Sequence, residues 1–588
     1  MKYSDQVADW LVKLGYSHCF YVAGGNTMHL LESLSQRLDC RPVVHEVAAG
    51  IAAEYFNEIS DGGKALVLVT AGPGMTNLIT ALAGAYLESR ELLVIGGQVK
   101  TADLARGKLR QRGIQEIDGV ALARPVTVRS ELVDAPLPFA DFAALVRATS
   151  RPRKGPVFIE MPLDVQARDV TFSPVRDEAA ADSYSLPCIS DADFRRLVER
   201  ICTAKRPLLL LGGGVSRETV AGVSERLIAS GLPIATTWNA ADRIDSAAKC
   251  YVGRPNTWGQ RSANLVLQQC DLLVALGTRL GMQQTGFNWQ SFVPGGQIVQ
   301  VDLDASELGK GHPKVDMPLQ ADANDVLVRL VNADLGDHGE WLGYAQGVRA
   351  AIPLVEAVNK TGEQYISPFT FADTLSTLCN NEDIVIPCSS GSAFTVMMQT
   401  FRQKSGQLIV TNKGLASMGY GLSGAIGAAF AYPARRVILV EGDGGFAQNL
   451  QEIGTAAINQ LNLKMFVFDD AGYASIRMTQ RSYFGGRYVG CDRKTGLGLP
   501  DWEKLFAAWD VPAIRIGKNY ASSEDFKRLF DSAGPAAFIV SVDPEQTYFP
   551  KITSRINETG AMESNPLHLM TPDLEPELFG RVTQFLNI

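Results

Sequence analysis

Residues 435–473 read RRVILVEGDGGFAQNLQEIGTAAINQLNLKMFVFDDAGY, and their pattern decides the fold. The apolar run 436–440 predicts a buried strand, and the glycine-rich residues 441–445 predict a sharp turn after it. The run 463–468 predicts a second strand. The residues between the two runs that recur with the period of a helix are Phe446, Leu450, Ile453 and Ala457. Strand, turn, helix and strand in succession favour a parallel sheet.

Acidic residues follow both expected strands. Asp443 comes after the first strand, and Asp469-Asp470 end the second. Ligands of open α/β sheets bind at the carboxyl ends of the strands, so we expect these carboxylates to lie together. A helix start favours phosphate, and carboxylates bind Mg²⁺ together with substrate phosphates. The stretch therefore predicts a Mg²⁺–diphosphate site, with an ordinary strand–helix–strand unit carrying a glycine turn as the alternative.

Composition bounds the class of protein. The chain has 588 residues, of which 46% are hydrophobic and 20% charged, and two to four globular domains are expected. A net charge of −8 without a basic block argues against nucleic acid as a partner. Nine scattered cysteines predict reduced thiols and a cytoplasmic protein. The absence of an 18-residue apolar run and of a signal peptide argues against a membrane protein.

Apolar runs and helical patterns alternate along most of the chain. We expect an α/β fold of three doubly wound parallel-sheet domains, at 1–170, 188–335 and 362–550, followed by a C-terminal tail at 551–588. The polar stretch 167–186 predicts a linker between the first two domains. The other runs expected as strands are 18–22, 41–44, 65–70, 92–97, 206–211, 233–237, 271–276, 297–301, 383–387 and 408–411.

Glu46 stands out in the first third of the chain. It follows an expected apolar strand directly and precedes a helix rich in small residues. A glutamate in apolar surroundings suits a general acid or base. A glutamate at a helix N-terminus also simply favours the helix dipole. The residues alone leave both interpretations open.

The segment Gly442-Asp443-Gly444, followed after the second expected strand by Asp469-Asp470, resembles the diphosphate-binding signature of thiamine-diphosphate enzymes. That signature ends in two asparagines, and this chain has aspartate at both positions, which adds negative charge beside a diphosphate. By the resemblance, Asp443 and Asp470 give side-chain ligands to Mg²⁺, and Gly472 gives a backbone carbonyl. The resemblance also makes cofactor-binding residues of Gly442, Gly444, Gly445 and Tyr473.

Four segments resemble, in order and spacing, the pyrimidine-binding domain of acetohydroxyacid (acetolactate) synthases: VAGGNTMH, VVHEVAAGIAAEYF, TAGPGMTN and GIQEIDGVALARPVT. In that family the glutamate at the position of Glu46 hydrogen-bonds N1′ of the cofactor's aminopyrimidine and promotes the imino tautomer. The cofactor supplies the chemistry, and the protein supplies orientation and protonation state. The resemblance brings Gly25 and Gln115 to the reacting centre, with Asn77 nearby.

The resemblance continues through the middle of the chain, where the synthases bind a mainly structural FAD. It implies FAD in this chain too, with an empty or ADP-binding middle domain as the alternative. Departures from the family pattern are Arg254-Pro255, Gly281, Gln283 and Ala321. The residues that fall on FAD-contacting positions are Arg151, Gly212, Gly213, Gly214, Thr237, Gly253, Gly277, Arg279, Asp302 and Asp322.

In the last third, the turn Ser390-Gly391-Ser392 falls at the cofactor, with Gly391-Ser392 in place of the family's Gln-His. By resemblance Met418 is the apolar residue that wedges the cofactor into its V shape, which is catalysis by orientation. The family has a tryptophan where this chain has Thr479. Since that tryptophan selects a small 2-keto acid, threonine should leave a larger and more polar acceptor pocket.

The resemblance implies decarboxylation of a 2-keto acid, pyruvate first, and transfer of the two-carbon unit to a carbonyl acceptor. Thr479 favours a bulky ketone such as a nucleotide-activated ketosugar; a second pyruvate, giving acetolactate, is the alternative. A flavin-dependent oxidase and a non-catalytic relative stay open as well. In this family Glu46 and Asp443 would come from different subunits, so a homodimer or a homotetramer is expected.

Overall fold

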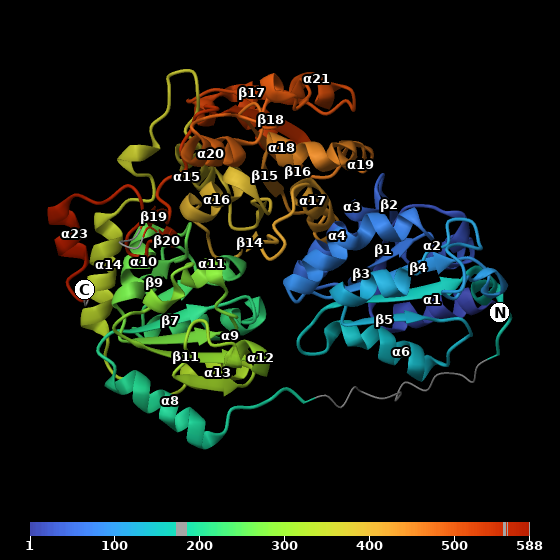
Figure 1. Cartoon of the computed structure of the whole chain (residues 1–588), viewed down its shortest axis with the longest axis horizontal. Helices are drawn as coiled ribbons and strands as arrows, with labels where there is room; N and C mark the ends of the chain where they lie inside the picture. The colour runs from blue at the N-terminus through green and yellow to red at the C-terminus, as the bar shows by residue number, and fades with distance from the viewer. Residues whose placement is uncertain (172–184, 557–559, 561, 587–588) are drawn as a thin grey trace.

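The structure is a computed structural model that describes residues 1–171, 185–556, 560 and 562–586. Most of the expected linker at 167–186 lies outside these residues. The described chain forms three six-stranded sheets whose strands all pair in parallel, which confirms the expected α/β class. Figure 1 shows the three bodies, with the N-terminal one in blue, the middle one in green and the last one in orange.

The first sheet has the strand order β2-β1-β3-β4-β6-β5. Val67, Leu68 and Val94 are fully buried in it, as strands covered by helices on both faces must be. Its strands are β1 (Tyr16–Tyr21), β2 (Asp39–Pro42), β3 (Lys64–Val69), β4 (Leu92–Gln98), β5 (Arg129–Leu132) and β6 (Pro156–Pro162). Its helices are α1 (Tyr3–Lys13), α2 (Met28–Ser35), α3 (Glu46–Ile59), α4 (Pro73–Leu87), α5 (Gly119–Ala123), α6 (Phe139–Arg147) and α7 (Leu163–Ala167).

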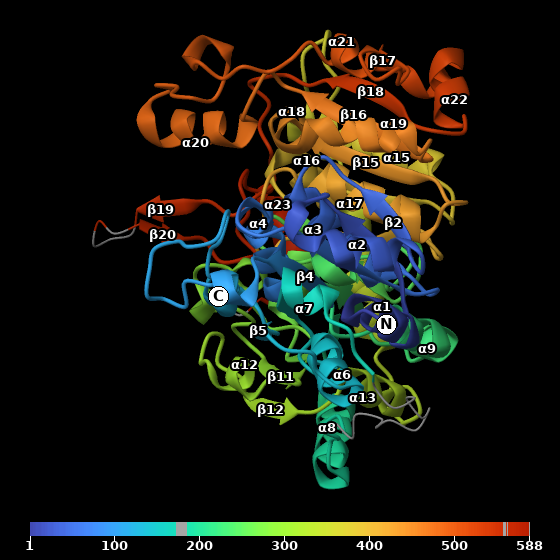
Figure 2. The same ribbon diagram turned by 90° about the vertical axis from the view of Figure 1, so that its right-hand side faces the viewer.

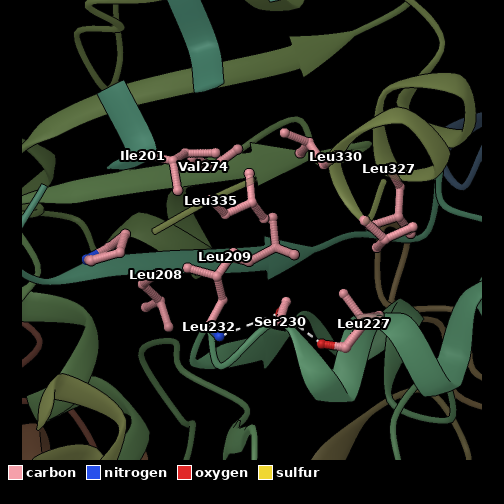
Figure 3. A pocket seen from close by; sticks show the side chains of 12 residues that line it. Ile201, Leu208, Leu209, Leu227, Ser230, Leu232, Val274, Leu327, Leu330 and Leu335 are labelled. Atoms are coloured by element: carbon pink, nitrogen blue, oxygen red, sulfur yellow. Dashed lines mark hydrogen bonds between the residues drawn. The ribbon is translucent and has the colours of Figure 1, made fainter. Parts of the chain in front are cut away.

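The second sheet has the order β12-β11-β10-β7-β8-β9. On one face its residues surround an apolar cavity of about 10 Å³, which is lined mainly by leucines and is no larger than a water site (Figure 3). Its strands are β7 (Pro207–Leu211), β8 (Ile234–Thr236), β9 (Tyr251–Gly253), β10 (Leu272–Leu276), β11 (Gln297–Asp302) and β12 (Met317–Gln320). Its helices are α8 (Asp191–Thr203), α9 (Arg217–Ala229), α10 (Arg261–Gln269), α11 (Met282–Thr285), α12 (Ala305–Gly309), α13 (Ala323–Leu330) and α14 (Gly339–Ala351).

The third sheet has the order β14-β13-β15-β16-β18-β17. Its strands are β13 (Ile384–Ile386), β14 (Leu408–Ile409), β15 (Val437–Gly442), β16 (Leu463–Asp469), β17 (Ala513–Ile516) and β18 (Ala536–Ser541). Its helices are α15 (Pro368–Leu378), α16 (Gly391–Thr400), α17 (Tyr420–Ala431), α18 (Asp443–Phe446), α19 (Ile453–Ile458), α20 (Ala474–Phe484), α21 (Trp502–Ala507) and α22 (Glu524–Phe530). The tail forms the hairpin β19 (Ser554–Ile556) and β20 (Met562–Ser564), then α23 (Pro576–Val582), which packs against α14 of the middle domain.

The prediction of one continuous helix after the glycine turn is wrong. The chain forms α18, then a 3₁₀ segment from Ala447 to Glu452, then α19. Asn449 leaves the helical region, with φ −133°, and its side-chain amide donates to the carbonyl of Gly419 at 2.7 Å. Asparagine side chains compete with the helix in this way. The two flanking strands are confirmed as β15 and β16.

Helices α3 and α17 join the first and third domains, and Figure 2 shows them side by side. They approach so closely that a Cβ at Gly427 would lie 2.0 Å from the carbonyl oxygen of Ala52. A Cβ at Gly424 would likewise lie 2.5 Å from the ring of Tyr55. Small residues on both helices therefore fix how closely the two domains pack. The position of α3 relative to α17 is set by this contact along the length of both helices.

Candidate functional site

The expected metal ligands lie at the carboxyl ends of β15 and β16, which are neighbours in the third sheet. Asp443 is the first residue of α18 and is only 1% exposed. Its carboxylate accepts hydrogen bonds from the backbone N–H of Gly444 at 2.6 Å and of Gly472 at 3.0 Å. Asp470 follows β16 and is also buried. The structure thus brings Asp443, Asp470 and Gly472 together.

Each of the two unexpected aspartates has an arginine partner. Arg477 on α20 donates to the Asp470 carboxylate at 2.8 Å and to the Asp470 carbonyl at 2.6 Å, and both side chains are buried. Arg515 on β17 pairs with Asp469 at 2.8 Å and is more exposed. Sequence reasoning noted the aspartates but not these arginines. Arg477 balances the charge that aspartate adds at an asparagine position.

The electrostatics of these carboxylates suit a divalent cation. Burial raises the pKa of Asp470 to about 7 although Arg477 acts against it. Burial, with Asp470 and Asp469 nearby, also raises the pKa of Asp443. A cation placed between the two carboxylates would relieve this cost. Among the described residues no group of three or more His, Cys, Asp or Glu is placed to hold a metal ion.

The other expected residues of this end surround the same sheet edge. Ser390 precedes α16 without a side-chain cap, and Ser392 lies in the first turn, so backbone N–H groups there are available to an anion. A Cβ at Gly444 would lie 2.3 Å from the ring of Tyr473, so this ring packs onto the glycine turn. Met418 is partly buried just before α17. Gly442, Gly445 and Gly391 lie in the turns that open α18 and α16.

Some of the strained backbone lies at this edge and at its counterpart in the first domain. Residues other than glycine with positive φ include Cys388 (51°), Ala416 (57°), Ala471 (64°) and Gln115 (62°). Ala471 sits between two of the expected metal ligands. Such conformations cost free energy and cluster at binding sites. Their positions beside the expected site residues agree with a built site.

In the first domain the expected residues lie at the carboxyl edge of the first sheet. Glu46 is the first residue of α3, is 8% exposed, and accepts a hydrogen bond from Asn77 on α4 at 3.0 Å. Gln115 packs against the start of α4. A Cβ at Gly72, the residue before α4, would lie 2.4 Å from the carbonyl oxygen of Gln115. Gly25 begins the short 3₁₀ turn after β1 and is exposed.

Glu452 holds the start of α3 from the third domain. Its carboxylate accepts from the N–H groups of Val44 at 3.1 Å and His45 at 3.0 Å, although it belongs to the segment after α18. Burial raises the pKa of Glu452, and these hydrogen bonds lower it. The residue fixes the backbone immediately before Glu46. Sequence reasoning missed it, since nothing in the local pattern marks a carboxylate that acts across domains.

The middle domain has a cavity of about 850 Å³ at the carboxyl ends of its strands, a volume typical of cofactor sites. Gly212 and Gly253 do not line it: a Cβ at either position would meet Gly277 or Gln260 within 2.3 Å. Arg254 is buried away from it and donates to the carbonyl of Phe401 in the third domain. The other expected residues do line it: Arg151, Gly213, Gly214, Thr237, Gly277, Arg279, Asp302 and Asp322.

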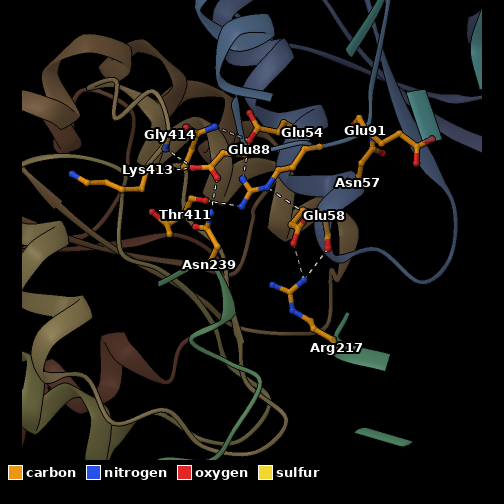
Figure 4. A network of polar contacts seen from close by, with 12 residues as sticks. Glu54, Asn57, Glu58, Glu88, Glu91, Arg217, Asn239, Thr411, Lys413 and Gly414 are labelled. Carbon is orange, nitrogen blue, oxygen red and sulfur yellow. Dashed lines mark hydrogen bonds and ion pairs between the residues drawn. The ribbon is translucent and has the colours of Figure 1, made fainter. Parts of the chain in front are cut away.

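One wall of this cavity is a charged network where the three domains meet (Figure 4). Arg90 pairs with buried Glu54 at 2.7 Å and donates to the carbonyl of Thr411 at 2.6 Å. Arg217 of the middle domain pairs with Glu58 at 3.1 Å. The Arg90 hydrogen bond to Thr411 and the Arg217–Glu58 pair link the first domain to the third and to the middle domain. The cavity is therefore bounded by all three domains.

Comparison with known proteins agrees with this geometry. Family models of thiamine pyrophosphate enzymes match the N-terminal TPP binding domain at residues 1–122, the central domain at 194–330 and the C-terminal TPP binding domain at 389–540. The acetolactate synthase large subunit of Corynebacterium glutamicum is 30% identical over 527 residues, covering 86% of this chain and 81% of its own. The chain belongs to the acetolactate synthase-like family of thiamine pyrophosphate enzymes.

Two further relatives of this enzyme span nearly the whole chain. The acetolactate synthase isozyme 1 large subunit of Escherichia coli K12 is 29% identical over 557 residues, covering 93% of this chain and 95% of its own. The isozyme 2 large subunit of the same organism is 27% identical over 573 residues, covering 95% and 99%. The expected family is thus confirmed. In the described part of the chain, the enzyme has no helix long and apolar enough to cross a membrane.

Helix α20, which carries the Thr479 expected at the acceptor pocket, has an exposed face. Thr479 is exposed on α20, and its hydroxyl donates back to the Ser475 carbonyl at 3.0 Å. Ile476 and Tyr483 on the same helix are 46% and 58% exposed. Exposed apolar side chains around a short polar one mark a surface that another group can cover.

Proposed function

We propose that the enzyme decarboxylates pyruvate and transfers the two-carbon unit to a second pyruvate, giving acetolactate. The observation that carries this proposal is the match to acetolactate synthase large subunits over more than four fifths of both chains. Two hydrogen bonds in the structure support it: Asn77 donates to the carboxylate of Glu46, and the backbone N–H of Gly472 donates to the carboxylate of Asp443.

Thiamine pyrophosphate, when bound, supplies the electron sink that decarboxylation of a 2-keto acid requires. Asp443, Asp470 and the carbonyl of Gly472 would hold the Mg²⁺ that anchors the diphosphate. Glu46, oriented by Asn77, would hold a proton at the aminopyrimidine end. Met418 would set the cofactor's conformation, and Gly25 and Gln115 would face the reacting carbon.

A bulky ketone, such as a nucleotide-activated ketosugar, is a second candidate acceptor. The short, exposed Thr479 side chain favours it, because threonine takes up less room on α20 than the tryptophan of the family would. Thr479→Trp should then lower turnover with the bulky ketone as acceptor and leave turnover with pyruvate alone unchanged. An equal loss with both acceptors would contradict a role in acceptor choice.

We infer that the cavity of the middle domain holds FAD. Its volume, its position at the carboxyl ends of the strands, and the eight expected residues that line it support this. The protein as purified should show flavin absorbance, and heat-released flavin should separate as FAD by chromatography. ADP or no nucleotide in that analysis would contradict the inference.

The deciding experiment incubates the protein with Mg²⁺, thiamine pyrophosphate and pyruvate, first alone and then with candidate ketones. Acetolactate from pyruvate alone is the expected product. Products that appear only when a bulky ketone is added would overturn acetolactate synthesis in favour of the second candidate. Peroxide or acetate with bleaching of bound flavin would mark an oxidase, and no consumption of pyruvate would mark a non-catalytic relative.

The active site is proposed to lie between two subunits, as the resemblance implies, with the pyrimidine end from one chain and the diphosphate end from the other. In a single chain no described hydrogen bond or ion pair links Glu46 to the Asp443 site. A homodimer, or a dimer of such dimers, would therefore be the active form.

A further inference from the structure

Lys413 is a partly buried cation that lines the cavity of the middle domain. It belongs to the third domain, in the segment between β14 and α17. Its backbone N–H donates to the Glu88 carboxylate at 2.5 Å, and the N–H of Gly414 donates to the same oxygen. A residue of the first domain therefore holds the backbone from which this side chain extends.

The ammonium of Lys413 makes no hydrogen bond to an oxygen or nitrogen and no ion pair in the described part of the chain. It lies over the ring of Phe394 on α16, with Nζ 4.9 Å from the ring centroid. Figure 4 shows the side chain extending away from Glu88. Burial lowers the pKa of Lys413. A charge taken out of water without a partner costs free energy, and contact with one ring offsets only part of that cost.

The cavity that Lys413 lines runs along the carboxyl edge of the second sheet. In that sheet β12 and β11 lie at one end, and β10 and β7 separate them from β8. The lining residues follow this order, with Asp322 after β12, Asp302 at the end of β11, Gly214 after β7 and Trp238 after β8. At about 4.8 Å per strand, the edge from β12 to β8 spans roughly 19 Å, so an elongated ligand would fill it.

Lys413 lies at the β8 end of this cavity. The ring of Phe394 packs edge-on against Trp238, with centroids 4.9 Å apart, and the same ring lies beneath the Lys413 ammonium. Asn239 donates to the Glu88 carboxylate at 2.5 Å, and this carboxylate also accepts from the backbone of Lys413. Both sets of contacts place Lys413 beside the turn that follows β8.

The chemistry of the lining orients a dinucleotide along the cavity. An acidic residue near a strand end hydrogen-bonds a ribose, and a glycine turn lets the backbone approach a diphosphate. Asp302 and Asp322 therefore suit the adenosine end of FAD, and Gly213 and Gly214 suit its diphosphate. The isoalloxazine ring would then reach the β8 end, where Lys413 lies.

We propose that the Lys413 ammonium donates a hydrogen bond to the N1–C2=O edge of the isoalloxazine ring of bound FAD. The proposal rests on the FAD assignment of the cavity made above and adds to it a contact from the third domain. Charge near N1 tunes the electronics of a flavin. Because reduced flavin carries negative charge on this edge, the positive charge of Lys413 raises the reduction potential of the bound flavin.

The test compares Lys413→Met with wild type in three measurements: the melting temperature of the apoprotein, the dissociation constant for FAD, and the reduction potential of the bound flavin at saturating FAD. Methionine keeps the contact with the Phe394 ring and removes an unpaired charge, so the apoprotein should be at least as stable. The dissociation constant for FAD should rise about tenfold, as expected for a lost hydrogen bond from a charged group. At a fixed solution potential the ratio of reduced to oxidised flavin should fall about tenfold, which is about 30 mV for a two-electron couple.

Two controls locate the contact on the molecule. ADP carries the adenosine and the diphosphate without the isoalloxazine ring, so Lys413→Met and wild type should bind ADP equally well. Lys154 lines the same cavity but is exposed, and an exposed charge is screened by solvent and salt. Lys154→Met should therefore leave the reduction potential of the bound flavin unchanged.

The outcomes separate this contact from the FAD assignment. Unchanged FAD affinity and reduction potential in Lys413→Met, with FAD bound by wild type, would overturn the contact alone. Equal weakening of FAD and ADP binding with an unchanged potential would also overturn it, because the lysine would then serve the adenosine or the diphosphate. Failure of wild type to bind FAD would overturn the FAD assignment and this inference together.

Discussion

Arg477→Met should be among the most destabilising single changes near the site. Arg477 is 3% exposed, and besides its pair with Asp470 it donates to the carbonyls of Pro544 and Cys491. Removing one partner of a buried ion pair costs about 3–5 kcal/mol, because Asp470 must then either keep an uncompensated charge or take up a proton. We expect the free energy of unfolding of the metal-free protein to fall by that amount, as measured by denaturant titration at pH 8.

The second half of a double-mutant cycle tests the reason for this cost. Asp470→Asn in the Arg477→Met background removes the stranded carboxylate, so it should restore about 1–3 kcal/mol. Full recovery is not expected, because the carbonyls of Pro544 and Asp470 lose the hydrogen bonds that Arg477 donates to them. The control is Arg515→Met, which breaks the more exposed pair with Asp469 and should cost less than about 1 kcal/mol.

Two results would refute this account of Arg477. A loss below about 1 kcal/mol would mean that solvent or a neighbouring group compensates Asp470, contrary to its burial. A double variant less stable than Arg477→Met alone would mean that the arginine acts through its carbonyl contacts and that the carboxylate is not its main partner.

Three further changes probe other parts of the molecule. Glu46→Gln should lower turnover by at least about 10²-fold with little change in melting temperature, and near-normal turnover would contradict its acid–base role. Gly427→Ala puts a Cβ against the Ala52 backbone and should cost about 1–3 kcal/mol or more in melting experiments, whereas Gly222→Ala on α9, with open space around it, should not. Burial raises the pKa of Glu160 to about 8, so its contribution to stability is full below the unfolded pKa, near 4.5, and is lost as pH rises through 8. Stability of wild type should therefore fall by up to about 1.4 kcal/mol per pH unit from this group, and Glu160→Gln should flatten the slope between pH 5 and 8.

The fold was largely predictable because strands buried on both faces are written as continuous apolar runs. The run at 436–440 and the run at 463–468 both proved to be strands, and the glycine turn between them opens a helix at Asp443. The prediction of one helix there was wrong, because the apolar residues keep a helical spacing across the break at Asn449. The break accompanies the hydrogen bond that Asn449 donates to the carbonyl of Gly419, a contact that the sequence pattern does not indicate.

The site was predictable only where the functional residues directly follow a predicted strand in the same segment. Asp443 and Asp470 follow their strands directly, so the sequence places them at one sheet edge. Arg477 reaches Asp470 because the chain reverses at Ala471, where φ is 64°, and no residue pattern indicates that reversal. Glu452 acts across domains, and such a contact depends on packing that a local pattern does not encode.

A heterodimer of two inactive chains decides whether the carboxylates act within one subunit or between two. One chain carries Glu46→Gln and the other Asp443→Asn, with different affinity tags, and the mixed dimer is isolated after coexpression. If each site takes its pyrimidine end from one subunit and its diphosphate end from the other, one of the two sites has both wild-type residues. The mixed dimer should then show about half the wild-type turnover, while each parent dimer stays inactive. If each subunit holds a whole site, every site in the mixed dimer carries one of the changes, and turnover stays at the parental level. That second result would contradict a shared active site even if both residues proved essential.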